Sequence, residues 1–331
     1  MRVYRLETIG NLDGLVAREE ARPVPSAGEV LVRVKASALN ARDLAILLGT
    51  LPFPMRPGVV PISDAAGEVE EIGPGVSTLK VGDRVVSRFL PTWYGGPRTP
   101  NQETYGSDRD GWLTEYKVVR AEALSFAPPG LTFEEAATLP CTAVTAWSAL
   151  AGVRAGDTVL TQGSGSVSLF ALQLAKLLGA RVIATTSSAQ NGERLKPLGA
   201  DAVVDYVENP QWAEAVRALT AGRGVDRVVE VGGPGTLAQS LKAVTYGGEI
   251  ALVGALARSD AGLDFMSLFM SQATLRCISI GSRVDVEAMQ RAVEAHAMHP
   301  VIDSVFPFTE AKSAWAHYAD RNVFGKVVIR H

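Results

Sequence analysis

The sequence predicts an α/β protein that begins with a mostly β domain and continues as a doubly wound parallel sheet. Three observations favour this fold class. Residues 1–125 carry strand patterns separated by turns, residues 126–282 alternate strand and helix patterns, and residues 157–188 form one complete strand–turn–helix–strand unit. The chain of 331 residues is long enough for about two such domains.

The composition excludes several classes of protein. Hydrophobic residues make up 47% of the chain and charged residues 20%, which is typical of a globular protein with a large core. The net charge of −3 gives no electrostatic reason to expect nucleic-acid binding. No apolar run is long enough to span a membrane, and residues 1–10 lack a signal-peptide core. We therefore expect a cytoplasmic protein with a small-molecule substrate, bound to neither nucleic acid nor membrane.

Strand patterns dominate the first domain. The alternation of apolar and polar residues in 29–35 predicts a half-buried strand. Further strands are expected at 66–72, 81–87 and 112–119, together with a short helix that ends near Gly49.

Strand and helix patterns alternate in the second domain. The expected strands are 158–161, 181–185, 202–205, 225–231, 249–253 and 275–280. Helices are expected at 132–139, 142–151, 212–219 and 236–243, together with one that follows the first of these strands and ends at Gly179. Six strands with helical crossovers form a doubly wound parallel sheet. Beyond residue 282, the patterns predict helices at 286–296 and 311–320 and a closing strand at 326–329.

A glycine-rich turn follows the first strand of this sheet and nearly fits the G-x-G-x-x-G pattern. Gly163 permits the tight turn, and Gly165 keeps a Cβ out of the path of a pyrophosphate. The helix start at Ser166 and Val167 directs N–H groups and a partial positive charge at the phosphates. Ser168 stands where a third glycine usually allows close packing of helix and strand. The pattern favours dinucleotide binding, and a purely structural turn is the alternative.

The end of the second strand favours NADPH over NADH. NAD-binding folds place a carboxylate about 20 residues after the glycine turn, where it binds the ribose. Residues 180–191 contain no acidic residue, and Thr186 takes the place of the carboxylate. Hydroxyl and N–H groups can donate to a 2′-phosphate, which a carboxylate would repel. We expect Ser187 and Asn191 near that phosphate and Tyr206 beside the adenine.

Several motifs, in a fixed order, resemble the medium-chain dehydrogenase/reductase superfamily over the full length of the chain. They are Pro57-Gly58, Asp64-Ala65-Ala66-Gly67-Glu68-Val69, Lys80-Val81-Gly82-Asp83-Arg84-Val85, Asp110-Gly111-Trp112-Leu113-Thr114-Glu115-Tyr116, Leu139-Pro140-Cys141 with Thr145-Ala146, Leu198-Gly199-Ala200-Asp201 and Gly325-Lys326-Val327-Val328-Ile329. The resemblance implies a GroES-like β domain of residues 1–125 completed by 283–331. It also implies a Rossmann dinucleotide-binding domain of residues 126–282, with the active site in the cleft between the two.

The departures from this family concern zinc. Its zinc alcohol dehydrogenases place cysteine, histidine and glutamate where this chain has Asn40, Ser63 and Asp64, and the remaining ligand position coincides with Cys141. One thiol and one carboxylate make a poor zinc site. The loop 91–110, where the cysteines of a structural zinc site would lie, contains no cysteine. We therefore expect no metal and a resemblance to the zinc-free, quinone-reductase-like branch, with Cys141 as a small core residue.

A site without zinc favours some acceptors over others. No strong Lewis acid polarises a plain carbonyl there, whereas a C=C bond conjugated to a carbonyl needs only hydrogen-bond donors for the enolate oxygen. We expect an NADPH-dependent oxidoreductase that transfers hydride to a quinone or an α,β-unsaturated carbonyl. A zinc-independent alcohol or ketone dehydrogenase and a catalytically silent NADPH-binding protein are the alternatives.

The resemblance also suggests individual site residues. We expect Asn40 and Thr145 near the nicotinamide and its ribose, with Asp43 orienting Asn40 or a neighbouring arginine. Asp43 could instead only stabilise the start of its helix. Tyr94 and Tyr105 are candidate proton donors, although surface tyrosines on a loop, with bulk water as the donor, are the alternative.

Further cofactor contacts are implied at strand ends. They are Val231, Val253, Gly254, Ala255, Ile278, Ile280, Gly281 and Lys326. The alternatives are plain strand-end turns and, for the lysine, a solvated side chain. Residues 275–280 are also too apolar for an exposed sheet edge, and the resemblance implies sheet-to-sheet dimers. We expect a homodimer through this strand, unless a helix or loop covers it.

Overall fold

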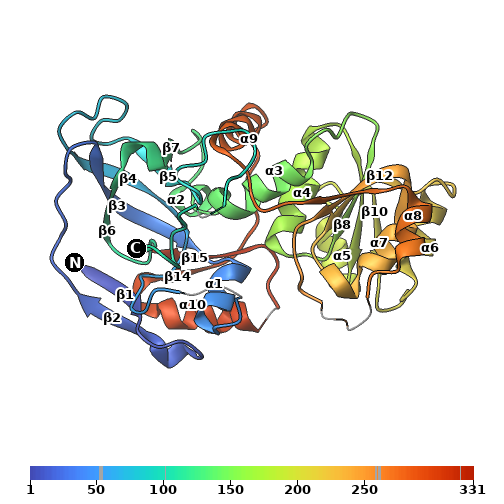
Figure 1. Ribbon diagram of the computed structural model, residues 1–331, viewed down its shortest axis with the longest axis horizontal. Helices are drawn as coiled ribbons and strands as arrows, with labels where there is room; N and C mark the ends of the chain where they lie inside the picture. Colours follow the sequence, from blue (N-terminus) through green and yellow to red (C-terminus); the bar gives the residue numbers. More distant parts are fainter. Residues whose placement is uncertain (52–54, 101, 258, 260–261, 321) are drawn as a thin grey trace. The chain divides into compact units, whose positions relative to one another are not determined.

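The computed structural model describes residues 1–51, 55–100, 102–257, 259, 262–320 and 322–331. The chain divides into two compact units, one formed by Met1–Thr142 with Ser282–His331 and the other by Ala143–Gly281 (Figure 1). Residues 126–142, which the sequence pattern assigned to the second domain, belong to the first unit. The reason is that α2 (Phe133–Ala136) packs on strands of the first unit, so the boundary expected at residue 125 moves to residue 142.

A large sheet forms the framework of the first unit. Within the described residues its strands follow the order β14-β15-β3-β4-β5-β7, and β6 also pairs with β3. The C-terminal strand β15 pairs antiparallel with β3 and parallel with β14, so segments from both parts of the chain that form this unit share one sheet. The bounds are β3 (Glu29–Ala38), β4 (Asp64–Ile72), β5 (Arg84–Ser87), β6 (Tyr116–Arg120), β7 (Leu124–Phe126), β14 (Ile302–Pro307) and β15 (Lys326–Arg330).

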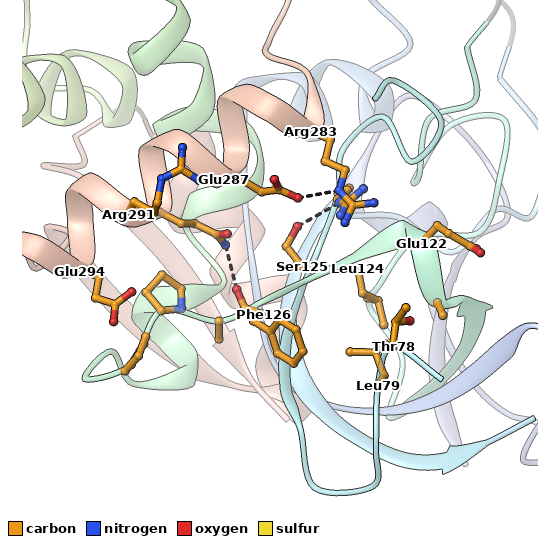
Figure 2. A pocket seen from close by; sticks show the side chains of 16 residues that line it. Thr78, Leu79, Glu122, Leu124, Ser125, Phe126, Arg283, Glu287, Arg291 and Glu294 are labelled. Carbon is orange, nitrogen blue, oxygen red and sulfur yellow. Dashed lines mark hydrogen bonds and ion pairs between the residues drawn. The ribbon is translucent and has the colours of Figure 1, made fainter. Parts of the chain in front are cut away.

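Three further α-helices and a pair of strands belong to the described part of this unit. They are α1 (Ala41–Leu47), α9 (Arg283–Ala295), α10 (Ala311–Ala319), and the antiparallel pair β1 (Arg2–Leu6) and β2 (Leu15–Glu19). Helix α9 begins where the chain returns to this unit, with Ser282 as its N-cap. Its Gln290 Nε2 donates to the Phe126 carbonyl at the end of β7, at 3.0 Å (Figure 2). This bond fixes α9 against the edge of the sheet.

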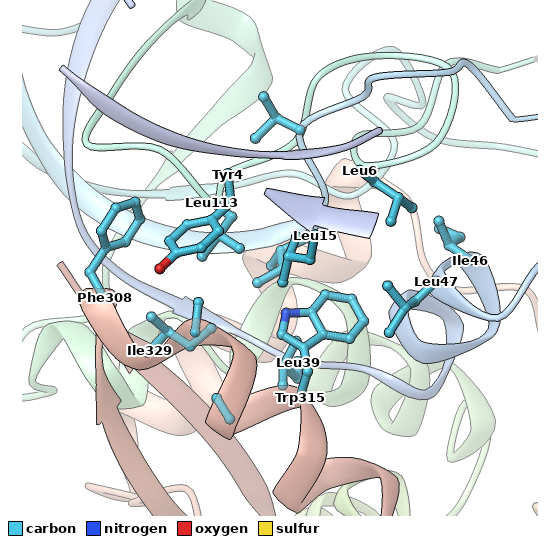
Figure 3. Close-up of a cluster of buried hydrophobic side chains, with 14 of the residues drawn as sticks. Tyr4, Leu6, Leu15, Leu39, Ile46, Leu47, Leu113, Phe308, Trp315 and Ile329 are labelled. Atoms are coloured by element: carbon cyan, nitrogen blue, oxygen red, sulfur yellow. The ribbon is translucent and has the colours of Figure 1, made fainter. Parts of the chain in front are cut away.

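An apolar cluster joins the N-terminal strands to the C-terminal helix. Figure 3 shows Trp315 of α10 near Leu15 of β2, near Leu47 of α1, and near Leu39, which lies between β3 and α1. All four side chains are buried. Full burial of an aliphatic side chain of this size stabilises a fold by roughly 2–3 kcal/mol. The cluster therefore holds α10, and through it β15, against the segment that carries Asn40.

The second unit is a parallel sheet covered by helices. Within the described residues its strand order is β10-β9-β8-β11-β12-β13, which confirms the doubly wound fold. The strands are β8 (Thr158–Gln162), β9 (Arg181–Thr186), β10 (Ala202–Asp205), β11 (Val225–Glu230), β12 (Val244–Leu252) and β13 (Thr274–Cys277). The helices are α3 (Val144–Ala149), α4 (Ser166–Leu177), α5 (Ala189–Leu195), α6 (Trp212–Leu219), α7 (Leu237–Ala243) and α8 (Phe265–Ser271).

The strand order reverses between β8 and β11, which lie side by side. In open α/β sheets, ligands bind outside the carboxyl ends of the strands at such a switch point. The glycine turn after β8 and the turn after β11 therefore occupy the place where a nucleotide is expected. No helix in the described part of the chain is long and apolar enough to cross a membrane.

Five of the described elements differ clearly from the sequence prediction. Strand β13 ends at Cys277, so the predicted strand 275–280 is too long, and β12 begins five residues earlier than the expected 249. Helices α5 and α8 and strand β14 were not predicted. The two helices have seven residues each, which is too short for a clear helical period.

Candidate functional site

The glycine turn has the backbone geometry of a phosphate-binding turn. Gly163 lies in the left-handed region with φ +74°, which favours glycine. Gly165 is the N-cap of α4 and has an ordinary φ of −74°. A Cβ on Gly165 would meet no protein atom within 4 Å. The fold itself therefore does not require glycine at 165, whereas close approach of a pyrophosphate to the N-terminus of α4 would.

Ser168 takes the position of the third glycine in this turn, and its small side chain still allows α4 to pack closely on β8. Its side chain is 2% exposed, and its Oγ donates to the carbonyl of Gln162 at 2.6 Å. The small hydroxyl thus ties the first turn of α4 to the end of β8. This hydroxyl therefore contributes to the packing of helix on strand.

The residues expected around the adenosine part of the cofactor lie close together. Asn191 Nδ2 donates to Ser164 Oγ of the glycine turn at 3.3 Å, which joins α5 to that turn. The main-chain N–H of Tyr206 donates to the Thr186 carbonyl at 2.9 Å. Thr186 is buried, and its hydroxyl exchanges hydrogen bonds with the main chain of Ser188. The Thr186 hydroxyl is thus already engaged.

Of the other polar residues near the end of β9, two have exposed side chains. Ser187 is exposed, and Tyr206 is 40% exposed, so both side chains can meet a ligand. A carboxylate that sequence reasoning did not consider, Asp205, pairs in register with Thr186 on the neighbouring strand. Its Oδ1 accepts the N–H of Val207 at 2.8 Å, so it stabilises its own turn.

A buried carboxylate holds the turn at the switch point. Glu230, at the end of β11, is fully buried, and its Oε1 accepts the N–H groups of Gly232 and Gly233 at 2.9 Å each. Gln162, at the end of β8, donates from Nε2 to Glu230 Oε2 at 2.9 Å and accepts the N–H of Val231 at 3.1 Å. The hydroxyls of Thr236 and Ser240 also donate to this carboxylate. Hydrogen bonds to an ionised group are worth more than neutral ones, so this network fixes the turn firmly.

Sequence reasoning missed this network. The signal was an acidic residue directly after the apolar run of β11 and directly before a glycine-rich turn. The segment after β12 packs on the same turn, because a Cβ on Gly254 would lie 2.7 Å from the Val231 carbonyl oxygen. A Cβ on Gly233 would similarly lie 2.7 Å from Ala255 Cα. Val231, Gly254 and Ala255, expected as cofactor contacts, are therefore brought together.

The remaining expected contacts of the second unit are buried or half-buried. The N–H of Val253 donates to the Glu230 carbonyl at 2.8 Å, and that of Ile278 donates to the Leu252 carbonyl at 2.8 Å. The side chains of Ile278 and Ile280 are buried at the carboxyl end of β13, as is Gly281. Thr145, on α3, is 6% exposed.

A polar cluster surrounds Asn40 in the first unit. Asn40 is 2% exposed, and its main-chain N–H donates to Asp43 Oδ2 at 2.9 Å. Lys326 Nζ donates to Asn40 Oδ1 and to the Leu39 carbonyl, both at 2.7 Å. Lys326 is fully buried, so the alternative of a solvated lysine is wrong. Asn40 Nδ2, at the other end of the amide, lies 3.5 Å from Ser63 Oγ.

Two buried carboxylates, those of Asp43 and Asp64, lie near the ammonium group of Lys326. Asp43 forms an ion pair with Arg42 at 3.5 Å, so it contacts both residues that it was expected to orient. Burial raises the pKa of Asp43 to about 6, against the opposing charge of Arg42. Asp64 accepts the Ser63 hydroxyl at 2.8 Å and the Cys141 N–H at 3.0 Å. Burial raises the pKa of Asp64 and lowers that of Lys326, and each charge opposes the shift of the other.

This cluster does not fit a zinc site. Of its side chains, Cys141, Asp64 and Asp43 are zinc-ligand types, but Asp43 already accepts the Asn40 N–H and pairs with Arg42. Burial raises the pKa of the Cys141 thiol, which disfavours the thiolate that binds zinc. The Lys326 ammonium already places a positive charge 2.7 Å from Asn40 Oδ1. A divalent cation beside it would be repelled. Among the described residues, no group of three or more histidine, cysteine, aspartate or glutamate side chains could hold a metal.

The two candidate proton donors differ in exposure. Tyr94 is 51% exposed, as expected for a surface loop. Tyr105 is 7% exposed and packs edge-on against Trp112, with ring centroids 5.6 Å apart. Burial raises the pKa of Tyr105. A surface position for Tyr105 is therefore wrong, because its ring belongs to the core of the first unit.

Two parts of the chain match known protein families. Residues 26–129 match the alcohol dehydrogenase GroES-like domain, and residues 166–295 match the family described as zinc-binding dehydrogenase. A zinc-type alcohol dehydrogenase-like protein of Schizosaccharomyces pombe is 40% identical, over 98% of this chain and 97% of that protein. Other curated relatives are described as quinone oxidoreductases and acryloyl-coenzyme A reductases.

Solved structures are similar over the full chain. An NAD-dependent alcohol dehydrogenase has a TM-score of 0.93 and 36% identity, with complete coverage of both chains. A mycobacterial protein in complex with NADPH has a TM-score of 0.83 and 29% identity, and also covers both chains completely. Together with the GroES-like sheet and the Rossmann strand order, these matches show that the chain belongs to the medium-chain dehydrogenase/reductase superfamily.

Proposed function

We propose that this protein is an oxidoreductase that uses NADPH to reduce a quinone or an α,β-unsaturated carbonyl compound without zinc. The observation that carries the proposal is the buried contact of Lys326 Nζ with Asn40 Oδ1 at 2.7 Å. It puts an ammonium group and a carboxamide where the zinc-dependent members need a cysteine. A site of this kind offers hydrogen-bond donors to an acceptor and no Lewis acid.

The second unit offers the groups that would hold NADPH. The main chain at Gly163, Gly165 and the first turn of α4 would bind the pyrophosphate. Ser187 and Asn191 would donate to the 2′-phosphate, and Tyr206 would pack beside the adenine. NADPH, when bound, supplies the hydride. The similar mycobacterial protein in complex with NADPH supports NADPH as the cofactor, whereas the similar NAD-dependent alcohol dehydrogenase would support NADH.

The Glu230 network gives the cofactor site its rigidity in this proposal. Its hydrogen bonds hold the turn after β11 and the end of β8 in one arrangement. A turn that is already ordered does not need to be ordered when the cofactor binds, so less binding free energy is lost.

Asn40 would act on the acceptor from the first unit. Because Lys326 occupies Oδ1, the orientation of the amide is fixed and Nδ2 is its donor end. Nδ2 donates to the Asp64 carboxylate and also lies 3.5 Å from Ser63 Oγ. Because the Ser63 contact is long, the second N–H of Nδ2 would donate to an acceptor oxygen as negative charge builds up there. Asp43 holds the main chain of Asn40, and Lys326 holds its side chain. Bulk water would then deliver the proton that completes the reduction.

A second candidate is a zinc-independent alcohol or ketone dehydrogenase. The similarity to the solved NAD-dependent alcohol dehydrogenase supports this second candidate. A panel of saturated ketones, enones and quinones, followed by the loss of NADPH absorbance, separates the two. Enones and quinones should be reduced fastest, whereas faster reduction of saturated ketones would favour the second candidate. No turnover with any acceptor, despite tight NADPH binding, would indicate a silent NADPH-binding protein.

The role of Asn40 can be tested with matched variants. Asn40→Asp keeps the contact with Lys326 but replaces the donor end by an acceptor, so kcat should fall by about a hundredfold, which corresponds to one lost donor to a developing oxyanion. Ser63→Ala removes this long contact and also the hydrogen bond from the Ser63 hydroxyl to Asp64. It should therefore lower stability but leave kcat within about threefold, because neither bond is made to the acceptor. Equal activity of Asn40→Asp and the native protein would contradict the assignment.

A further inference from the structure

A cavity of about 450 Å³ lies in the first unit beside α9 (Figure 2). Its walls come from residues 78–79 before β5, from Arg88 after β5, from β7 with the residues on either side of it, and from one face of α9. Its lining shares no residue with the Asn40 cluster. Its volume is within the range of small-molecule sites, roughly 300–1,000 Å³.

Arg88 is the unusual member of this lining. It follows β5 directly and is 3% exposed. Its Nε donates to Ser125 Oγ at 2.9 Å, whereas its buried Nη1 has no hydrogen-bond partner among the described residues. Burial, with the charge of Arg283, lowers the pKa of Arg88 to about 10, so the guanidinium is still charged at neutral pH. A buried cation with an unused donor is costly unless an anion or polar ligand meets it.

The other charges of the cavity do not neutralise this guanidinium directly. Figure 2 shows Glu287 pointing at Arg283, with which it forms an ion pair of 2.6 Å within α9. Glu122, Arg291 and Glu294 are exposed side chains, so solvent screens their charges. The buried part of the cavity is therefore cationic.

The rest of the buried lining is apolar. Leu79 is 9% exposed and Leu124 is 4% exposed, and the ring of Phe126 and the chain around Pro128 extend this surface. An apolar wall beside one buried cation fits a ligand with one negative charge and a hydrocarbon part. A phosphate dianion fits less well, because it would meet a single guanidinium and would lie near the carboxylate of Glu287.

We propose that this cavity binds a small aliphatic or aromatic carboxylate, with the carboxylate at the guanidinium of Arg88 and the apolar part against Leu79 and Leu124. This site is separate from the proposed hydride chemistry and does not depend on it. Its ligand belongs to the class of medium-length organic acids.

The test is a binding experiment on the full chain. Hexanoate is titrated into the protein by calorimetry, beside hexanamide as a neutral molecule of the same shape and inorganic phosphate as a compact anion. We expect saturable binding of hexanoate, at least about tenfold tighter than that of hexanamide or phosphate, a difference of about 1.4 kcal/mol. Equal binding of hexanamide, tighter binding of phosphate, or no saturable binding of hexanoate would overturn the proposal.

Two variants locate the site. Arg88→Met removes the buried charge and keeps most of the side-chain volume, and it should weaken hexanoate binding at least about tenfold. Arg291→Met removes an exposed charge from the same cavity and should change binding less than about twofold, because exposed charges are screened. Unchanged hexanoate affinity in a folded Arg88→Met variant, checked by circular dichroism, would refute the assignment. The comparison of hexanoate with hexanamide uses the unchanged protein, so it decides the proposal even where this variant fails to fold.

Discussion

Replacing Gly165 by alanine separates cofactor binding from folding. The backbone at this position has a φ of −74°, which alanine adopts freely, and the new methyl group would meet no protein atom within 4 Å. The unfolded chain loses some freedom on this change, whereas alanine is a poorer N-cap than glycine, so stability should change by less than about 1 kcal/mol in either direction. The methyl group would, however, enter the space in which we place the pyrophosphate.

The expected loss of affinity follows from the contacts displaced. One charge-assisted hydrogen bond from the main chain to a phosphate contributes about 1.5–3 kcal/mol. The dissociation constant of NADPH should therefore rise by about ten- to a hundredfold. Quenching of tryptophan fluorescence by NADPH measures this constant, and thermal unfolding without nucleotide measures stability.

Two other glycines serve as controls. Gly163→Ala forces a left-handed φ of +74° on alanine, so it should cost about 1–2 kcal/mol of stability even without nucleotide. Gly95→Ala, in the first unit, would place its Cβ in ordinary contact with Val284 at 3.4 Å and should change neither quantity. An NADPH affinity in Gly165→Ala within about twofold of the native value, where at least a tenfold loss is expected, would refute the placement of the pyrophosphate at this turn.

Three other measurements test the remaining assignments. Thr186→Asp should lower kcat/KM for NADPH about ten- to a hundredfold relative to NADH, because a carboxylate repels the 2′-phosphate. The neutral Thr186→Asn variant should leave this preference unchanged. An unchanged ratio in Thr186→Asp would contradict the placement of the 2′-phosphate near residue 186. The pKa of Asp43 is raised from 3.8 to about 6, so its stabilising contribution is complete below pH 4 and is lost as the pH rises through 6. Urea unfolding should therefore show the native protein losing about 1 kcal/mol relative to Asp43→Asn between pH 5 and pH 7, and parallel pH profiles would speak against this shift. Sedimentation at micromolar concentration should give the mass of two chains, because β13 is an edge strand of the described sheet that we expect to pair with a second copy, and a one-chain mass would count against the homodimer.

The regular elements were predictable where the pattern is local. Strand Ala202–Asp205 and helix Trp212–Leu219 lie where the sequence placed them, because each has a clear period and a clear break at its ends. Helix α5 was missed because it buries only Gly192 and Leu195, and its start depends on the side chain of Ser188. Such an element is stabilised by its surroundings more than by its own sequence.

Individual residues of the candidate site could be predicted from the sequence, but the contacts between them could not. The motifs pointed to Asn40 and Asp43, and the structure places them in contact. The bond between Lys326 and Asn40 joins residues 286 positions apart, and no local pattern in a closing strand distinguishes a buried lysine from a solvated one. Glu230 was overlooked for the same reason, since its partners Gln162 and Ser240 come from two other elements.

The central claim is that this member of the superfamily reduces conjugated acceptors with NADPH and without zinc. The most direct measurement is the rate of NADPH oxidation with an enone, a quinone and a saturated aldehyde, on purified protein whose zinc content is measured by elemental analysis. We predict turnover of the enone and the quinone well above that of the aldehyde, in protein containing far less than one zinc per chain. One tightly bound zinc per chain, together with faster reduction of the aldehyde, would contradict the account.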